Sequence, residues 1–141
     1  MVYVDTSALV KRYLQEPFSA EFDALLQQGA MATSRLTVVE LRCALARRRR
    51  KREIDALREN RINAELAADI QDGALRLSSV GDADFNAAYH LIGRLADLPL
   101  SSMDALHLAA AEQIGANAFA TADKTQAEAA TALGFTVHRF F

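Results

Sequence analysis

Residues 2–9 read Val-Tyr-Val-Asp-Thr-Ser-Ala-Leu, and this stretch decides the predicted fold. Its first three residues are apolar and include two β-branched valines, which favours a short strand. Asp5, Thr6 and Ser7 follow, and all three are residue types that cap the first free backbone amides of a helix. A helical pattern then continues to Gln15. A strand that passes directly into a helix is typical of an α/β fold, in which functional sites form beyond the carboxyl ends of strands.

The rest of the chain alternates between short β-prone runs and longer helical patterns, with few glycines and prolines between them. We expect strands at residues 2–4, 30–33, 75–77, 118–121 and 135–138, and helices at 6–15, 18–28, 36–52, 55–72, 82–95, 102–114 and 124–133. Strands that alternate with helices pair in parallel through right-handed crossovers. The pattern therefore predicts a single α/β domain over residues 1–141.

The composition is that of a soluble globular protein, with 51% apolar and 24% charged residues in 141. The net charge of −2 gives no overall attraction for nucleic acid, yet ten of the 16 Lys and Arg residues lie between positions 35 and 61. The single cysteine, Cys43, excludes an intrachain disulfide and suits a reducing cytoplasm, where we expect the protein to act. We find no membrane span and no secretory signal in the sequence.

Four acidic residues are the candidate functional groups: Asp5, Glu40, Asp104 and Asp123. Asp5 and Asp123 follow predicted strands and are expected on the same rim of the sheet. Each of these two also has a simpler interpretation as a helix cap. Asp104 lies on the apolar side of a predicted helix with Leu100 and Leu108, and the alternative is a favourable charge in the first turn.

Glu40 interrupts a predicted apolar stripe on its helix, formed by Leu36, Val39, Cys43 and Ala44. A carboxylate inside such a stripe costs several kcal/mol unless it is paired or bound to a metal. The alternatives are a position at the edge of the stripe, or an ion pair with Arg42 or Arg47.

Carboxylates that gather at one site repel one another unless a cation lies between them. Mg²⁺ or Mn²⁺ suits an all-oxygen site, whereas zinc is disfavoured because no His and Cys residues have suitable spacing. His107 lies three residues after Asp104, and a histidine there is more often a hydrogen-bonding neighbour than a ligand. A metal held by carboxylates indicates phosphate chemistry.

Four motifs occur in a characteristic order: residues 2–9, Val-Val-Glu-Leu at 38–41, Met-Asp-Ala-Leu-His-Leu-Ala-Ala at 103–110, and Phe-Ala-Thr-Ala-Asp at 119–123. With these motifs the whole chain resembles the PIN domain family, and specifically the VapC-type toxins of bacterial toxin–antitoxin pairs. The resemblance implies a three-layer α/β/α fold with a short, mostly parallel five-stranded sheet. It also implies a metal-dependent endoribonuclease toxin, which a VapB-like antitoxin inhibits and which commonly forms a homodimer.

Carried over to this chain, the resemblance makes Asp5 and Asp104 the main ligands of Mg²⁺ or Mn²⁺. Glu40 and Asp123 would bind the ion directly or through water, or orient the attacking water. The supporting hydroxyl residues are Thr6, Ser7 and Thr121.

Basic residues form a second group of candidates, with more than one interpretation each. The run Arg47, Arg48, Arg49, Arg50, Lys51 and Arg52 can contact RNA phosphates, meet acidic residues of the antitoxin, or form a solvated helix end. Lys11 and Arg12 are candidates to stabilise the transition state, and a solvated helix face is the alternative for both.

Two other functional classes remain open at this stage. One is a non-catalytic RNA- or protein-binding module on the same fold. The other is a different phosphate enzyme, such as a phosphatase or a receiver-type domain, which is disfavoured because Asp5 lacks an acidic neighbour.

Overall fold

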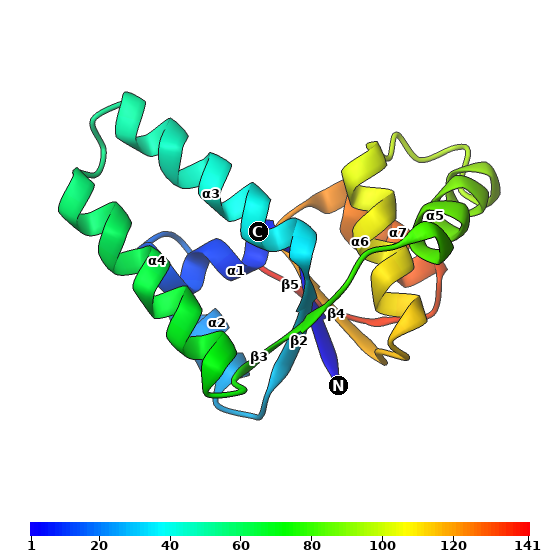
Figure 1. The fold of residues 1–141 in the computed structure, drawn as a ribbon. Helices are drawn as coiled ribbons and strands as arrows, with labels where there is room; N and C mark the ends of the chain where they lie inside the picture. The colour runs from blue at the N-terminus through cyan, green and yellow to red at the C-terminus, as the bar shows by residue number, and fades with distance from the viewer.

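The computed structural model describes all 141 residues and contains five strands and seven helices (Figure 1). The strands are β1 (Val2–Val4), β2 (Met31–Ser34), β3 (Leu75–Ser78), β4 (Ala118–Thr121) and β5 (Thr136–Arg139). The helices are α1 (Thr6–Tyr13), α2 (Ser19–Leu26), α3 (Arg35–Arg50), α4 (Ala56–Gln71), α5 (Asp82–Arg94), α6 (Ser102–Gln113) and α7 (Lys124–Ala132). Every element matches one predicted from the sequence, with ends that differ by a few residues at most.

The five strands form one sheet in the order β3-β2-β1-β4-β5, and every neighbouring pair is parallel. β1 lies at the centre between β2 and β4. Helices cover both faces of the sheet (Figure 1). The predicted three-layer α/β/α fold is confirmed, and the sheet is parallel throughout.

Two apolar clusters hold the layers together, one on each face of the sheet. The first contains side chains of α1, α2, α3 and α4, and the second contains side chains of α5, α6 and α7. Alternate residues of the central strands face opposite clusters, as the pleat of a strand requires. Val4 and Ala120 belong to the first cluster, whereas Tyr3 and Phe119 stack on each other in the second.

The buried face of α3 differs from the predicted one. Thr37, Leu41 and Leu45 face the core, whereas Val39 is 64% exposed and Cys43 is also exposed. The stripe that begins at Leu36 is therefore not the core face. Threonine is polar and hides the true stripe in the sequence, but the Thr37 hydroxyl is bonded to that of Thr33 and is fully buried.

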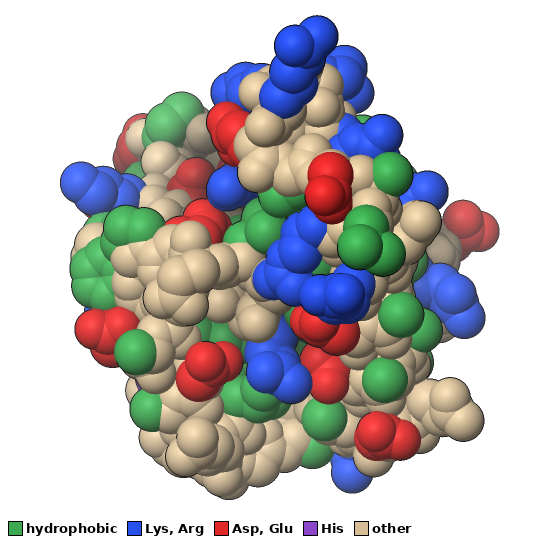
Figure 2. Space-filling view, turned by 90° about the vertical axis from the view of Figure 1, so that its left-hand side faces the viewer, with side chains coloured by type: hydrophobic (Ala, Val, Ile, Leu, Met, Phe, Trp, Pro, Cys, Tyr) green, Lys and Arg blue, Asp and Glu red, His purple; other side chains and the backbone are tan.

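Ion pairs neutralise part of the basic α3–α4 region. Arg42 and Arg49 both pair with Glu59 of α4, at 3.8 and 2.7 Å. Arg48 pairs with Glu16 at 3.3 Å and also with Glu53. Figure 2 views this side of the molecule, where Lys and Arg side chains are interspersed with Asp and Glu. None of the helices combines the length and the apolar character needed to cross a lipid bilayer.

Candidate active site

The site lies beyond the carboxyl ends of β1 and β4, which are adjacent in the sheet. Asp5 follows β1 directly, and its backbone N–H donates to the carbonyl of Ala120 in β4 at 3.1 Å. Asp123 follows β4 by two residues and begins α7. Because parallel strands end at the same edge, the two acids share one rim, as the sequence predicts.

Asp5 is the most buried of the four acids, with 3% of its surface exposed. Its carboxylate caps α1 by accepting from the Ala8 N–H at 2.9 Å. It also accepts from the Ser7 hydroxyl at 2.8 Å and from the Thr121 hydroxyl at 2.7 Å. Burial raises the pKa of Asp5 to about 6, although these donors and the nearby His107 lower it in part.

Ser7 and Thr121 also connect Asp5 to the turn before α7. The Ser7 hydroxyl accepts from the Ala122 N–H, and the Thr121 hydroxyl accepts from the Asp123 N–H, each at 2.9 Å. Each hydroxyl therefore donates its single proton to Asp5 and accepts a hydrogen bond from a backbone N–H. These two predicted supporting residues hold the turn of Asp123 against Asp5.

Glu40 approaches the same region from the first half of α3. One oxygen, Oε1, accepts from the Thr6 hydroxyl at 2.9 Å and is also bonded to His107 Nε2. The other ring nitrogen of His107, Nδ1, is bonded to the buried Tyr3 hydroxyl at 2.8 Å. An ionised carboxylate only accepts, so Nε2 carries the proton. The result is a chain from Tyr3 through His107 to Glu40.

His107 decides the charge of Glu40. Burial raises the pKa of Glu40, but the hydrogen bond and the charge of His107, together with the Thr6 hydroxyl, outweigh it, and the net pKa lies below its usual range. The side chain of His107 is 3% exposed and that of Glu40 is 30% exposed. Glu40 is therefore only half-buried, at the edge of the core face of α3. It forms no ion pair with Arg42 or Arg47, so that alternative is wrong.

Asp104 and Asp123 are placed at the starts of two helices. Asp104 forms a reciprocal capping box with Ser101, in which its carboxylate accepts from the Ser101 N–H at 3.3 Å. The Asp123 carboxylate accepts from the Gln126 N–H at 2.8 Å and is exposed. Gln126 joins the two helices, because its amide donates to the Asp104 carbonyl at 3.4 Å.

A groove of about 1000 Å³ runs from this rim along α3. Its acidic end is lined by Thr6, Ser7, Glu40, Met103 and Ala122. Each of the other three predicted acids is next in sequence to one of these lining residues: Asp5 precedes Thr6, Asp104 follows Met103 and Asp123 follows Ala122. Glu40 therefore lines this end of the groove, and Asp5, Asp104 and Asp123 adjoin residues that line it.

The four carboxylates do not converge on a single point in this structure, since no three Asp, Glu, His or Cys side chains form a ligand cluster. This arrangement still fits Mg²⁺ or Mn²⁺, because Mg²⁺ keeps several waters and is often held by one or two carboxylates together with substrate phosphate. The donors are all hard oxygens. A cation beside Asp5 would also offset the burial that raises the pKa of Asp5.

Two contributors to the site were not identified as such from the sequence. In the sequence, Tyr3 is recognisable only as a strand residue. Gln126 lies in a polar helical pattern, yet it is 1% exposed and bonded to Thr121 and to the Asp104 carbonyl. His107 was expected to be a hydrogen-bonding neighbour, which agrees with its contact to Glu40. His107 lies three residues after Asp104 on one helix, and this spacing is the sequence signal that places His107 near the site.

An all-parallel α/β/α sandwich with acidic residues at one rim defines the class of protein, and the sequence comparison identifies the family. The sequence model described as PIN domain matches residues 2–132. The chain belongs to the PIN domain family. No curated protein matches the sequence.

Solved structures with the same fold span nearly the whole chain. VapC20 of Mycobacterium tuberculosis, described as a Sarcin-Ricin loop cleaving toxin, superposes with a TM-score of 0.74 at 19% identity, covering 96% of this chain and 97% of that one. VapBC2 of Rickettsia felis, bound to promoter DNA, superposes with a TM-score of 0.68 at 13% identity, and the match covers 100% of both chains. DNA-bound VapBC of Salmonella typhimurium superposes with a TM-score of 0.68 at 16% identity, and the match covers 99% of this chain and 98% of that one.

Proposed function

We propose that this protein is a metal-dependent endoribonuclease toxin that hydrolyses RNA phosphodiester bonds at the acidic end of the groove. The observation that supports the proposal is that the adjacent groove residues Thr6 and Ser7 are bonded to Glu40 and Asp5 respectively, in a chain of the PIN domain family. VapC20, which shares the fold, is described as a toxin that cleaves the Sarcin-Ricin loop.

In this proposal Asp5 and Asp104 hold Mg²⁺ or Mn²⁺, with Asp123 contributing directly or through water. When bound, the ion polarises a phosphoryl oxygen and lowers the pKa of water for attack. Glu40 is kept ionised by His107 and lines the groove, so its free oxygen accepts the proton of the attacking water. Ser7 and Thr121 keep the Asp5 carboxylate in one orientation.

The proposal includes a protein partner. Several structures with this fold are toxin–antitoxin complexes, and those of Rickettsia felis and Salmonella typhimurium are bound to DNA. A VapB-like antitoxin would inhibit this chain in the cytoplasm, and the active form would be a homodimer.

The test is digestion of total RNA by the purified protein with Mg²⁺, with Mn²⁺ and with EDTA. We expect cleavage with either ion and none with EDTA. Asp104→Asn keeps the capping oxygen but removes the charge, so it should fold normally and lose cleavage. Equal cleavage by the wild type with and without EDTA would contradict the proposal.

A non-catalytic RNA-binding module is the second candidate. The observation that favours it is the absence of a three-ligand cluster, together with the full set of donors already bound to Asp5. Such a module would bind RNA equally well with EDTA, and Asp5→Asn would leave that binding unchanged, with no cleavage under any condition.

A further inference from the structure

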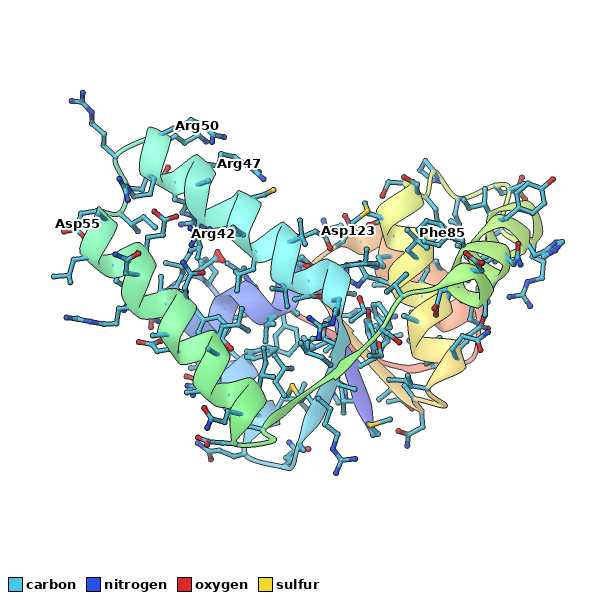
Figure 3. All side chains as sticks on the ribbon, viewed as in Figure 1. Arg42, Arg47, Arg50, Asp55, Phe85 and Asp123 are labelled. Atoms are coloured by element: carbon cyan, nitrogen blue, oxygen red, sulfur yellow. The ribbon has the colours of Figure 1, made fainter.

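The structure divides the basic run at the end of α3 into three groups. Arg48 and Arg49 are held in ion pairs with glutamates. Arg47 and Lys51 have no ion-pair partner and line the groove, whereas Arg50 and Arg52 have none and do not line it. In Figure 3, Arg47 and Arg50 lie toward the end of α3 that is distant from the sheet. The groove therefore has unneutralised positive charge along its α3 wall.

Lys11 supplies a cation on the opposite wall, close to the acidic end. It follows Ser7 by four residues on α1, so the two lie on the same side of the helix, one turn apart. Both line the groove. Lys11 is only 9% exposed, and its ammonium donates to the Pro17 carbonyl at 2.9 Å. The Phe18 ring centroid lies 6.0 Å away.

Lys11 has no carboxylate partner in this structure. Its ammonium donates to one carbonyl, so two of its three N–H donors are free for an anion in the groove. Its neighbour Arg12 is different, because it is 38% exposed and pairs with Asp69 at 3.5 Å. Of the two cations on α1, only Lys11 is available to an anion in the groove.

We infer that Lys11 and Arg47 bind two different phosphates of the RNA backbone, Lys11 beside the acidic end of the groove and Arg47 further along α3. The inference rests on the proposed function for the identity of the polymer. Arg47 follows Glu40 by seven residues, which is about 10 Å along a helix. Arg47 is therefore placed for a phosphate further along the strand than the one at the acidic end.

The location of Lys11 favours RNA over an acidic protein as the anion. Lys11 lies one helical turn from the Ser7 hydroxyl that is bonded to Asp5. A nucleic-acid backbone brings a phosphate to the cleavage point by necessity, and the next phosphates follow along the strand.

The experiment measures binding of a fluorescein-labelled, 12-nucleotide RNA pool of random sequence in EDTA, over a range of NaCl concentrations. Lys11→Met keeps most of the buried stem and removes the charge. We expect roughly tenfold weaker binding for Lys11→Met, with the slope of log Kd against log salt reduced by about 0.7. Arg47→Ala should behave similarly, and Lys11→Arg should recover most of the affinity.

Matched controls separate specific contacts from general charge. Arg12→Met changes the adjacent cation, and Arg50→Ala removes an unpaired arginine of the same run outside the groove. Both should bind RNA within about twofold of the wild type, because Arg12 is paired with Asp69 and Arg50 does not line the groove. Thermal unfolding of each variant shows that the chain is folded.

Unchanged affinity and salt slope in Lys11→Met would overturn the inference, as would equal losses in Arg47→Ala and Arg50→Ala. Weaker binding of a polyglutamate peptide with unchanged binding of RNA would assign the cations to an acidic protein partner and also overturn it. Because binding is measured in EDTA, the result is independent of cleavage. A protein that binds RNA as expected but never cleaves it would refute the proposed function alone.

Discussion

Asp5 and Glu40 are carboxylates at the same end of one groove, yet their surroundings shift their pKa values in opposite directions. Asp5 is buried among hydroxyl and amide donors, and its pKa rises to about 6. Glu40 is half-buried against His107, and its pKa falls. Glu40 has a direct hydrogen bond to the His107 ring, whereas Asp5 is bonded only to neutral hydroxyl and amide groups. A cation bound beside Asp5 would therefore offset a larger cost of burying a carboxylate than one bound beside Glu40.

The largest expected effect is the loss of cleavage in Asp5→Asn. The amide can keep the bond from the Ala8 N–H but cannot supply a negative charge to a cation. We expect RNA cleavage to fall roughly a thousandfold or more, because the metal contributes several kcal/mol to the transition state. Single-turnover cleavage of a labelled RNA in Mg²⁺ measures this.

Asp55→Asn is the matched control for Asp5→Asn. Asp55 caps α4 as Asp5 caps α1, with its carboxylate accepting from the Arg58 N–H at 2.8 Å. It lies at the far end of the α3–α4 arm (Figure 3). Cleavage in Asp55→Asn should equal that of the wild type. A comparable loss in both variants would mean that capping, not the site, explains the effect.

Glu40→Gln should lose about a hundredfold in kcat with little change in KM, which is the size of a typical general-base contribution. The glutamine keeps an oxygen for Thr6 and His107 but cannot take a proton from water. Steady-state kinetics across RNA concentrations provide the measurement. A rise in KM with unchanged kcat would instead show that Glu40 binds substrate and takes no part in the proton transfer.

The two carboxylates should also affect stability with opposite signs. Between about pH 4 and 6 the folded state holds the Asp5 proton more tightly than the unfolded state, so stability falls as the pH rises through this window. Asparagine does not titrate, so Asp5→Asn is free of this loss of stability. Because the pKa of Asp5 is raised by about two units, the substitution should increase the free energy of unfolding at pH 7.5 in EDTA by up to about 3 kcal/mol. The gain should disappear near pH 4.

Glu40 has the reverse linkage, because its folded pKa is lowered. Its contribution to stability is present above the unfolded pKa and is lost as the pH falls through the folded one. Glu40→Gln should therefore lower the Tm at pH 7.5 and have less effect in acid. Thermal unfolding of both variants at pH 4 and 7.5 tests the contrast, and a Tm shift of the same sign in both would refute it.

The smallest of these effects belongs to His107. Glutamine places its amide near the position of Nε2, whereas asparagine reaches only as far as Nδ1. His107→Gln should keep the bond to Glu40 and most of the activity, and His107→Asn should lose about tenfold in kcat, in the range of residues that orient a site. Equal losses with an unchanged pH profile would indicate a purely structural role for the ring.

Local signals explain why the elements could be predicted so closely. Asp5, Asp55 and Ser101 cap helices through their own side chains, and Gly73 and Gly115 follow helix ends with positive φ. These features depend on a few neighbouring residues. The shared rim of Asp5 and Asp123 follows from parallel pairing alone, so it too was accessible from the sequence.

Long-range contacts explain what the sequence could not provide. Glu40 and its partner His107 are 67 positions apart, and no pattern in either helix connects them. The core face of α3 was misread because Thr37 is polar and its partner Thr33 lies in a strand. The burial of Lys11 depends on the loop at Pro17 that closes over it. Whether the four acids share one ion stays a prediction.

In the proposed mechanism, Asp5 is a buried carboxylate whose charge a divalent ion stabilises. The most direct test is a ¹³C NMR titration of the Asp5 carboxyl carbon, with EDTA and with saturating Mg²⁺. We expect a pKa near 6 in EDTA and a clear decrease when Mg²⁺ is present. An Asp5 pKa that is the same in both conditions would contradict it.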